Sequence, residues 1–224
     1  QQALISEWKK EGIEKPEDNL IITGTNKETT ILNRWAQTLR QEDQKIGEQY
    51  LTNDGDKLHE GDRIIFTKNA APRGIRNGSF GTIEKVNEST NELTAHLDNG
   101  RSVQVCLDDY ANIKLGYAVT THKGQGMTGH NIYVLTDEAI QDRELSYVQT
   151  SRARSTTRIF TTEVEAGADL NQLTQVMNRS HQKELATTLL DRDERIRNEL
   201  RRQEQLAQQR EQTQGIELGY SLSM

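Results

Sequence analysis

The sequence predicts an α/β protein with a parallel sheet, into which a small β-barrel is inserted and after which a charged helix follows. Three observations lead to this fold class. A short apolar strand is followed by an amphipathic helix, as in half of a βαβ unit. Several short alternating segments with Asn-Gly turns come next, which is typical of a small barrel. The strand–helix–strand order then returns.

The first half of the predicted sheet begins at residues 19–23, an apolar run that ends at Gly24. Thr25 and Glu28 have the spacing of a capping box, in which each side chain satisfies a free amide of the first helical turn. The helix that follows has apolar residues at helical spacing. These are Ile31, Leu32, Trp35 and Leu39.

The predicted barrel lies between residues 51 and 107. Its strands alternate apolar and polar residues, and Asn-Gly pairs mark the turns because both residues tolerate positive φ. The strands are expected at 61–66, 81–86 and 93–97, and the turns at Asn77-Gly78 and Asn99-Gly100.

The α/β pattern resumes after the barrel, and a charged helix follows it. Residues 185–210 are rich in Glu, Arg and Gln without Gly or Pro, which indicates a solvated helix or a weak helix–helix contact. Residues 215–224 are expected to form a frayed tail. The remaining elements are strands at 131–135 and 157–161 and a helix at 143–154.

Composition limits the function. The net charge is −6 and the pI is about 5.5, so a generally basic nucleic-acid binder is excluded and any such contact must come from a local patch. Cys106 is the single cysteine, in an alternating run typical of a half-buried strand. No signal peptide or membrane span is present, so we expect a cytoplasmic protein without membrane insertion. Because it begins at Gln1, the chain is expected to be a fragment of a longer protein.

Residues 124–129 read G-x-G-x-x-G, the letters of a dinucleotide-binding loop. That loop requires a helix after it to hold the pyrophosphate, whereas residues 131–135 predict a strand. The sequence lacks the P-loop pattern G-x-x-x-x-G-K-[ST]. The apolar run with two acids at 132–138 resembles the strand that holds Mg²⁺ in ATPases, but without a P-loop there is no bound phosphate on which it could act. We therefore predict that the chain by itself does not hydrolyse ATP.

A family resemblance explains the same loop. The segment AVTTHKGQGMTGHNIYVL, at 118–135, resembles motif V of RecD-like superfamily 1 helicases, and LSYVQTSRAR, at 145–154, resembles their motif VI. Residues 61–86 are similar to the SH3-like barrel of this branch, and 23–33 to its motif IV region. The resemblance covers about residues 19–162 and is strongest to the helicase part of conjugative relaxases.

The resemblance implies site residues. Arg152 would be an arginine finger, a permanently charged fork that stabilises charge on the γ-phosphate of ATP. Gln125 and Gly126 would also lie at the nucleotide, and the complete motor would use ATP and Mg²⁺, with no cofactor expected in this chain alone. Single-stranded DNA would be bound through Thr25, Asn26, Thr121, His122 and Lys123.

A local basic patch adds to this set. The predicted barrel contains four cations with only Asp62 as a nearby acid, which suits a surface that guides or splits DNA strands. A solvated loop is the alternative for this patch. The cations are Arg63, Lys68, Arg73 and Arg76.

The resemblance implies the second RecA-like domain of a 5′-to-3′ DNA helicase that works with a relaxase. Its partners would be an N-terminal motor domain that carries the P-loop, and a relaxase domain or other conjugation proteins. The alternative is a helicase-derived docking module for single-stranded DNA or protein. We expect the first motor segment at 1–50, the SH3-like barrel at 51–110, the rest of the motor domain at 111–165 and a helical extension at 166–224.

Overall fold

The computed structural model describes residues 1–124, 127–136 and 141–180, and residues Gln1–Ser180 form one compact unit. The fold is mixed α/β with a parallel sheet, as predicted. The sheet has the order β11-β10-β1-β9. Its strands are β1 (Asn19–Thr23), β9 (Ala118–Thr120), β10 (Gly129–Leu135) and β11 (Ala153–Phe160).

Strands β1, β9 and β10 are buried on both faces, which explains their apolar runs. Ile21 and Tyr133 pack with α1 (Gln2–Gly12) and α2 (Asn26–Glu42) in one core, whereas Leu20 and Ile132 lie in a second core on the other face. The capping box predicted at the start of α2 is confirmed, with Thr25 as the N-cap. The other helices are α3 (Arg143–Thr150), α4 (Glu163–Ala166) and α5 (Asn171–Asn178), with 3₁₀ turns η1 (Ala71–Arg73) and η2 (Ala168–Leu170).

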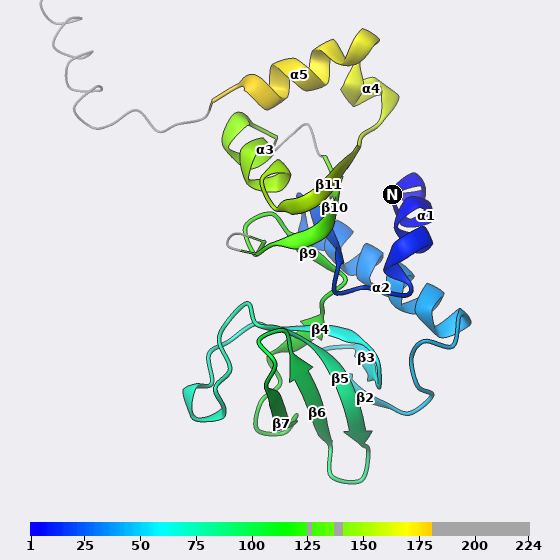
Figure 1. The fold of residues 1–224 in the computed structure, drawn as a ribbon, viewed down its shortest axis with the longest axis vertical. Helices are drawn as coiled ribbons and strands as arrows, with labels where there is room; N and C mark the ends of the chain where they lie inside the picture. The colour runs from blue at the N-terminus through cyan, green and yellow to red at the C-terminus, as the bar shows by residue number, and fades with distance from the viewer. Residues whose placement is uncertain (125–126, 137–140, 181–224) are drawn as a thin grey trace, which may run out of the picture. The chain divides into compact units, whose positions relative to one another are not determined.

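Seven strands are inserted between α2 and β9. They form an antiparallel hairpin, β2-β3, and a five-stranded antiparallel sheet in the order β7-β6-β5-β4-β8. Figure 1 shows strands β4 to β7 gathered below the parallel strands. The bounds are β2 (Tyr50–Asn53), β3 (Asp56–His59), β4 (Arg63–Phe66), β5 (Phe80–Asn87), β6 (Glu92–Leu97), β7 (Ser102–Cys106) and β8 (Ile113–Leu115).

A buried polar cluster joins the inserted strands to α2 and β9. The fully buried Asp62 accepts hydrogen bonds from the Tyr117 hydroxyl at 2.6 Å, from Gln37 Nε2 at 2.6 Å and from the His59 amide at 2.8 Å. Arg40 donates to the Tyr117 hydroxyl at 3.1 Å and to the Gly61 carbonyl at 2.6 Å. Burial raises the pKa of Asp62, and the three donors oppose that shift.

The structure differs from the sequence-based expectations at two places. Helix α1 was not predicted, although Leu4, Ile5 and Trp8 are buried on one side of it. Helix α3 ends at Thr150 rather than at residue 154, because residues 153–160 pair with β10. The charged helix predicted at 185–210 lies outside the described residues. In the described part of the chain, no helix is long and apolar enough to cross a membrane.

Candidate nucleic-acid interface

The segments predicted to contact DNA come together because two parallel strands end side by side. Strands β1 and β9 are paired, with Thr23 opposite Thr120. The chain continues from Thr23 into the cap of α2 and from Thr120 into the turn at 121–124. Parallel neighbours deliver their carboxyl ends to the same edge, where ligands of open α/β sheets bind. The motif IV and motif V resemblances thus meet at one edge of the sheet.

The turn at 121–124 presents two cationic or titratable side chains to solvent. It is closed by the Gly124 amide, which donates to the Thr120 carbonyl at 2.9 Å. His122 and Lys123 are exposed, whereas Thr121 is 1% exposed. The Thr121 hydroxyl donates to the Thr23 carbonyl at 3.0 Å and accepts from Gln149 at 2.9 Å. Thr121 therefore does not offer its side chain to DNA, which corrects the expectation for this residue.

At the start of α2, the Thr25 side chain is hydrogen-bonded to Glu28, and the side chain of Asn26 is exposed. The Thr25 hydroxyl accepts from the Glu28 amide at 3.3 Å and donates to the Glu28 carboxylate at 2.9 Å. Asn26, the next residue, is exposed. Of the two predicted motif IV contacts, Asn26 is the one whose side chain is available.

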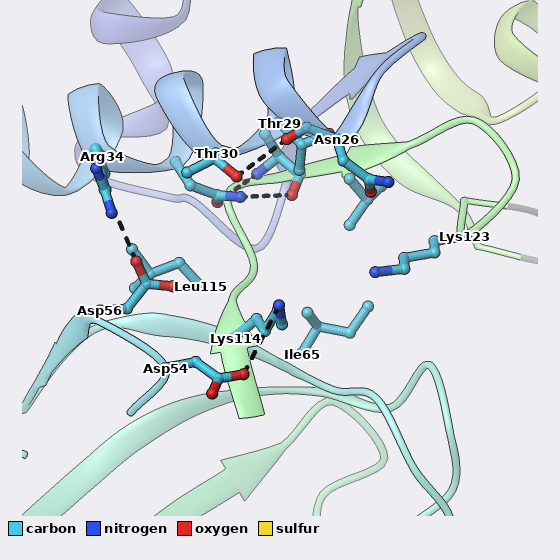
Figure 2. Close-up of a pocket in the computed structure, with 13 residues that line it drawn as sticks. Asn26, Thr29, Thr30, Arg34, Asp54, Asp56, Ile65, Lys114, Leu115 and Lys123 are labelled. Atoms are coloured by element: carbon cyan, nitrogen blue, oxygen red, sulfur yellow. Dashed lines mark hydrogen bonds and ion pairs between the residues drawn. The ribbon is translucent and has the colours of Figure 1, made fainter. Parts of the chain in front are cut away.

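A cavity of about 340 Å³ opens between α2 and the inserted strands (Figure 2). Figure 2 shows Asn26 and Lys123 at the same hollow, with Lys114 across from α2. Two ion pairs lie in it, Arg34–Asp56 at 3.8 Å and Lys114–Asp54 at 4.0 Å. The full lining is Asn26, Thr29, Thr30, Asn33, Arg34, Asp54, Asp56, Ile65, Lys114, Leu115, Ala118, Val119 and Lys123.

The charge of this cavity favours an anion. Its three cations outnumber its two carboxylates, and Lys123 has no acidic partner among the described residues. Burial also raises the pKa of Asp56. Lys123 lines a neighbouring hollow of about 510 Å³ together with His122. Because Lys123 lines both hollows, a chain of phosphates could run from one hollow to the other alongside it.

The pairs Arg34–Asp56 and Lys114–Asp54 were missed by sequence reasoning. The four residues come from α2, from the β2–β3 hairpin and from β8, which are far apart in the chain. No local motif marks them, since the fold alone brings them together.

The basic patch predicted in the inserted strands divides into two classes. Arg63 is 4% exposed; its guanidinium pairs with the Asp98 carboxylate and lies over the Phe80 ring at 5.2 Å. It is a structural residue and is withdrawn from the proposed DNA-binding set. Arg73 is partly exposed and pairs with Asp109 at 3.4 Å.

Lys68 and Arg76 form the second class. Both are exposed, and neither has an acidic partner in the part of the chain that the structure describes. Asp62, the acid next to the patch in sequence, is buried in the cluster with Tyr117 and does not face these cations. The two free cations are those that remain available to phosphates.

Arg152 lies in the turn between α3 and β11. Its Nε donates to the Val148 carbonyl at 2.9 Å, and no carboxylate pairs with its guanidinium among the described residues. The side chain is partly exposed. A cation held by one backbone contact and lacking an internal counter-ion suits an external phosphate. Gln125 and Gly126 lie outside the described residues.

Comparison with known proteins adds sequence relatives. The chain is 31% identical over 163 residues to conjugal transfer protein TraA of Agrobacterium fabrum, which covers 71% of this chain and 15% of TraA. It is 33% identical over 97 residues to the ATP-dependent RecD2 DNA helicase of Deinococcus radiodurans, covering 42% of this chain and 13% of RecD2. The chain thus spans about a seventh of these relatives. No family model matches it.

A solved structure supports the fold. The Pif1 helicase from Bacteroides, crystallised with ADP-AlF3 and single-stranded DNA, superimposes with a TM-score of 0.51 at 19% identity. The match covers 88% of this chain and 50% of Pif1. At this identity the likeness concerns the fold alone, and it agrees with the two sequence relatives. The predicted resemblance is confirmed: the chain is a homologue of the conjugal transfer protein TraA and of the RecD2 DNA helicase.

Proposed function

We propose that the chain is the second motor domain of an ATP-dependent DNA helicase that works with a conjugative relaxase. The observation that carries the proposal is the shared edge of β1 and β9. This edge brings Asn26 and Lys123 to one cation-rich hollow, and His122 and Lys123 to the neighbouring one; Lys123 has no acidic partner among the described residues. The relatives, which are a conjugal transfer protein and a DNA helicase, agree with this reading.

Single-stranded DNA is the proposed ligand of this edge. Lys123 would neutralise a backbone phosphate, and Asn26 and His122 would donate hydrogen bonds to neighbouring phosphates. We propose that the inserted strands form the SH3-like barrel of the RecD-like branch, with Lys68 and Arg76 guiding the strand. Their exposure and lack of acidic partners support this role.

Arg152 is the proposed link to ATP hydrolysis. ATP with Mg²⁺ would be held mainly by a separate N-terminal motor domain that carries the P-loop. ATP supplies the phosphoryl group whose transfer drives the motor. Arg152 would place its guanidinium beside the γ-phosphate, where a fixed positive charge lowers the barrier. The lack of a carboxylate partner among the residues that the structure describes fits that task.

The proposed division of the chain follows the sequence. Residues 1–50 and 111–165 would build the motor domain, 51–110 the barrel, and 166–224 a helical extension with the charged helix. The alternative function is a docking module for protein or single-stranded DNA. Tyr147, Val164 and Leu170, which are 69%, 82% and 57% exposed, favour a protein contact on the side of α3 and α4.

Oligonucleotide binding tests the proposal. The chain is titrated into a fluorescein-labelled dT oligomer, and anisotropy is recorded between 20 and 200 mM salt. We expect Lys123→Ala to weaken binding about tenfold and to reduce the salt slope by about 0.7, the value for one phosphate contact in single strands. Lys9→Ala, at an exposed lysine of α1, is the charge-matched control and should bind as the wild type.

ATP turnover separates the motor from the docking module. The isolated chain should show no ATPase above background with single-stranded DNA. Turnover by the isolated chain that Arg152→Ala abolishes would contradict the need for a partner domain. Failure of the wild-type chain to bind the oligomer even at low salt would leave protein docking as the better function.

A further inference from the structure

A chain of buried hydrogen bonds connects the turn at 121–124 to helix α3. Gln141 Nε2 donates to Gln149 Oε1 at 2.9 Å, and Gln149 Nε2 donates to the Thr121 hydroxyl at 2.9 Å. The Thr121 hydroxyl donates to the Thr23 carbonyl at 3.0 Å. Gln141, Gln149 and Thr121 are 3%, 1% and 1% exposed. We call these four residues, Thr23, Thr121, Gln149 and Gln141, the relay.

The direction of the relay is fixed by its end on the backbone. A carbonyl can only accept, so the Thr121 proton must point at Thr23, and the Thr121 oxygen must then accept from Gln149. The Gln149 amide nitrogen therefore faces Thr121, and its oxygen faces Gln141. Each side chain has one orientation that satisfies the hydrogen bonds of its neighbours. A shift of one side chain therefore changes the hydrogen bond to the next.

The far end of the relay carries an unsatisfied acceptor. Gln141 uses its amide N–H groups on Gln149 and on the Ser146 hydroxyl, the latter at 2.6 Å, and its buried Oε1 has no hydrogen-bond partner in the part of the chain that the structure describes. The relay therefore ends on a backbone carbonyl at Thr23 and on a side-chain amide with a spare acceptor at Gln141.

The relay joins the two functional segments of the proposed motor. Thr121 is followed directly by His122 and Lys123, the proposed DNA contacts. Gln149 lies three residues before Arg152, whose Nε is bound to the carbonyl of Val148, the neighbour of Gln149. The turn is thus connected to the end of the helix that positions Arg152 through the buried Gln149–Thr121 hydrogen bond and the partly buried Arg152–Val148 hydrogen bond.

We propose that Gln149 is a positioning residue, which through Thr121 transmits DNA occupancy of the turn at 121–124 to Arg152. The inference rests on the proposed function, since it needs DNA at the turn. It assigns to Gln149 and Thr121 a role without any contact to DNA or nucleotide. The buried hydroxyl of Thr121, which removes it from the DNA-binding set, is the part that connects the two segments.

The first test uses nuclear magnetic resonance on the isolated chain with a dT oligomer. In the wild type, the oligomer should shift the backbone amides of His122 and Lys123 and also the Nε–H of Arg152. In Gln149→Met, which keeps the length of the side chain without its hydrogen bonds, the His122 and Lys123 shifts should persist and the Arg152 shift should vanish. Thr121→Val should behave as Gln149→Met, and Thr121→Ser, which retains the hydroxyl, as the wild type.

The outcomes distinguish the two proposals. If the wild-type turn does not respond to the oligomer, the proposed DNA binding fails. If the turn responds but the Arg152 shift is absent from the wild type, or persists in Gln149→Met, the relay is refuted while DNA binding stands.

A second test uses the complete motor protein. There Gln149→Met should reduce the DNA stimulation of kcat by about 5-fold or more, the lower range of allosteric coupling, while KM for ATP stays unchanged. Equal stimulation in Gln149→Met and wild type would overturn the inference.

Discussion

Tyr117 is the residue whose hydroxyl holds the inserted strands to the motor sheet, so Tyr117→Phe is the most informative stability variant. The change removes one oxygen from a fully buried site without altering the ring. It deprives Asp62 of its hydrogen bond at 2.6 Å and Arg40 of one at 3.1 Å. Arg40 retains the Gly61 and Ile13 carbonyls, and Asp62 retains Gln37 and His59. The main loss is therefore one hydrogen bond to a buried carboxylate.

The magnitude follows from that count. A hydrogen bond to a charged group contributes about 1.5–3 kcal/mol, so we expect Tyr117→Phe to lower the free energy of unfolding by about 2–3 kcal/mol. For a chain of this size the melting temperature should fall by roughly 4–12 °C. The measurement is urea unfolding followed by tryptophan fluorescence, since the buried Trp8 lies edge-on to Tyr117 with ring centroids 6.0 Å apart.

The pH dependence of this loss has a defined sign. Burial raises the pKa of Asp62 above its ordinary value of 3.8, so its negative charge costs stability as pH rises through the folded-state pKa. Removing a donor raises that pKa further. The difference between wild type and Tyr117→Phe should be largest at neutral pH and should shrink as pH falls towards 3.8.

Tyr147→Phe, at an exposed tyrosine, is the matched control and should change stability by less than about 0.5 kcal/mol. An equally small effect at Tyr117, or a loss independent of pH, would refute the account of the buried cluster.

Three further predictions follow from the described contacts. In the complete motor, Arg152→Ala should lower DNA-stimulated kcat by about 10³-fold or more. Oligonucleotide binding by the isolated chain should be unchanged in this variant. A loss of DNA affinity instead would contradict the assignment of Arg152 as an arginine finger. The double variant Lys68→Ala/Arg76→Ala should weaken oligonucleotide binding without lowering the melting temperature, whereas Arg63→Met should lower the melting temperature because it breaks the pair with Asp98. Gly81→Ala in β5 should destabilise the chain more than Gly124→Ala, because a Cβ at Gly81 would lie 2.7 Å from the His96 carbonyl oxygen, whereas one at Gly124 would lie 3.4 Å from its nearest neighbour, the Thr121 carbonyl oxygen; calorimetry of both variants decides this.

The sequence predicted correctly those elements that depend on residues close to one another in the chain. The capping box of Thr25 and Glu28 uses residues three apart, and the apolar run at 19–23 needs only its own letters to indicate a strand buried on both faces. The Asn99-Gly100 turn likewise follows from the positive φ of Gly100, +83°.

Predictions that depended on distant residues were wrong or incomplete. Arg63 was counted as free because its partner Asp98 lies 35 residues away in the chain. Thr121 was assigned to DNA because motif letters do not say which side chain of a turn points inward. The end of α3 was placed too late, since residues 153–160 form helix or strand according to a neighbour, β10, that the local pattern does not reveal.

The negative net charge of the chain raises the question of how it could bind DNA. The net charge of −6 is a sum over the whole molecule, yet at physiological ionic strength a charge is screened within about 8 Å. A phosphate at the edge of β1 and β9 therefore responds to Lys123 and its immediate neighbours more than to distant carboxylates. In the cavity that Lys123 lines, Arg34 and Lys114 each have a carboxylate partner, whereas Lys123 has none among the described residues.

Such an arrangement favours a weak and strongly local hold on each phosphate. A motor must release every phosphate it binds in order to advance, and a generally basic surface would oppose that release through many simultaneous contacts. A chain that is acidic overall, with Lys123 as a cation of this cavity that has no acidic partner among the described residues, keeps the attraction short in range. If this reasoning is correct, a charge reversal of remote surface carboxylates should tighten oligonucleotide binding far less than neutralising Asp54 beside Lys114, and anisotropy titrations at 150 mM salt would measure the difference.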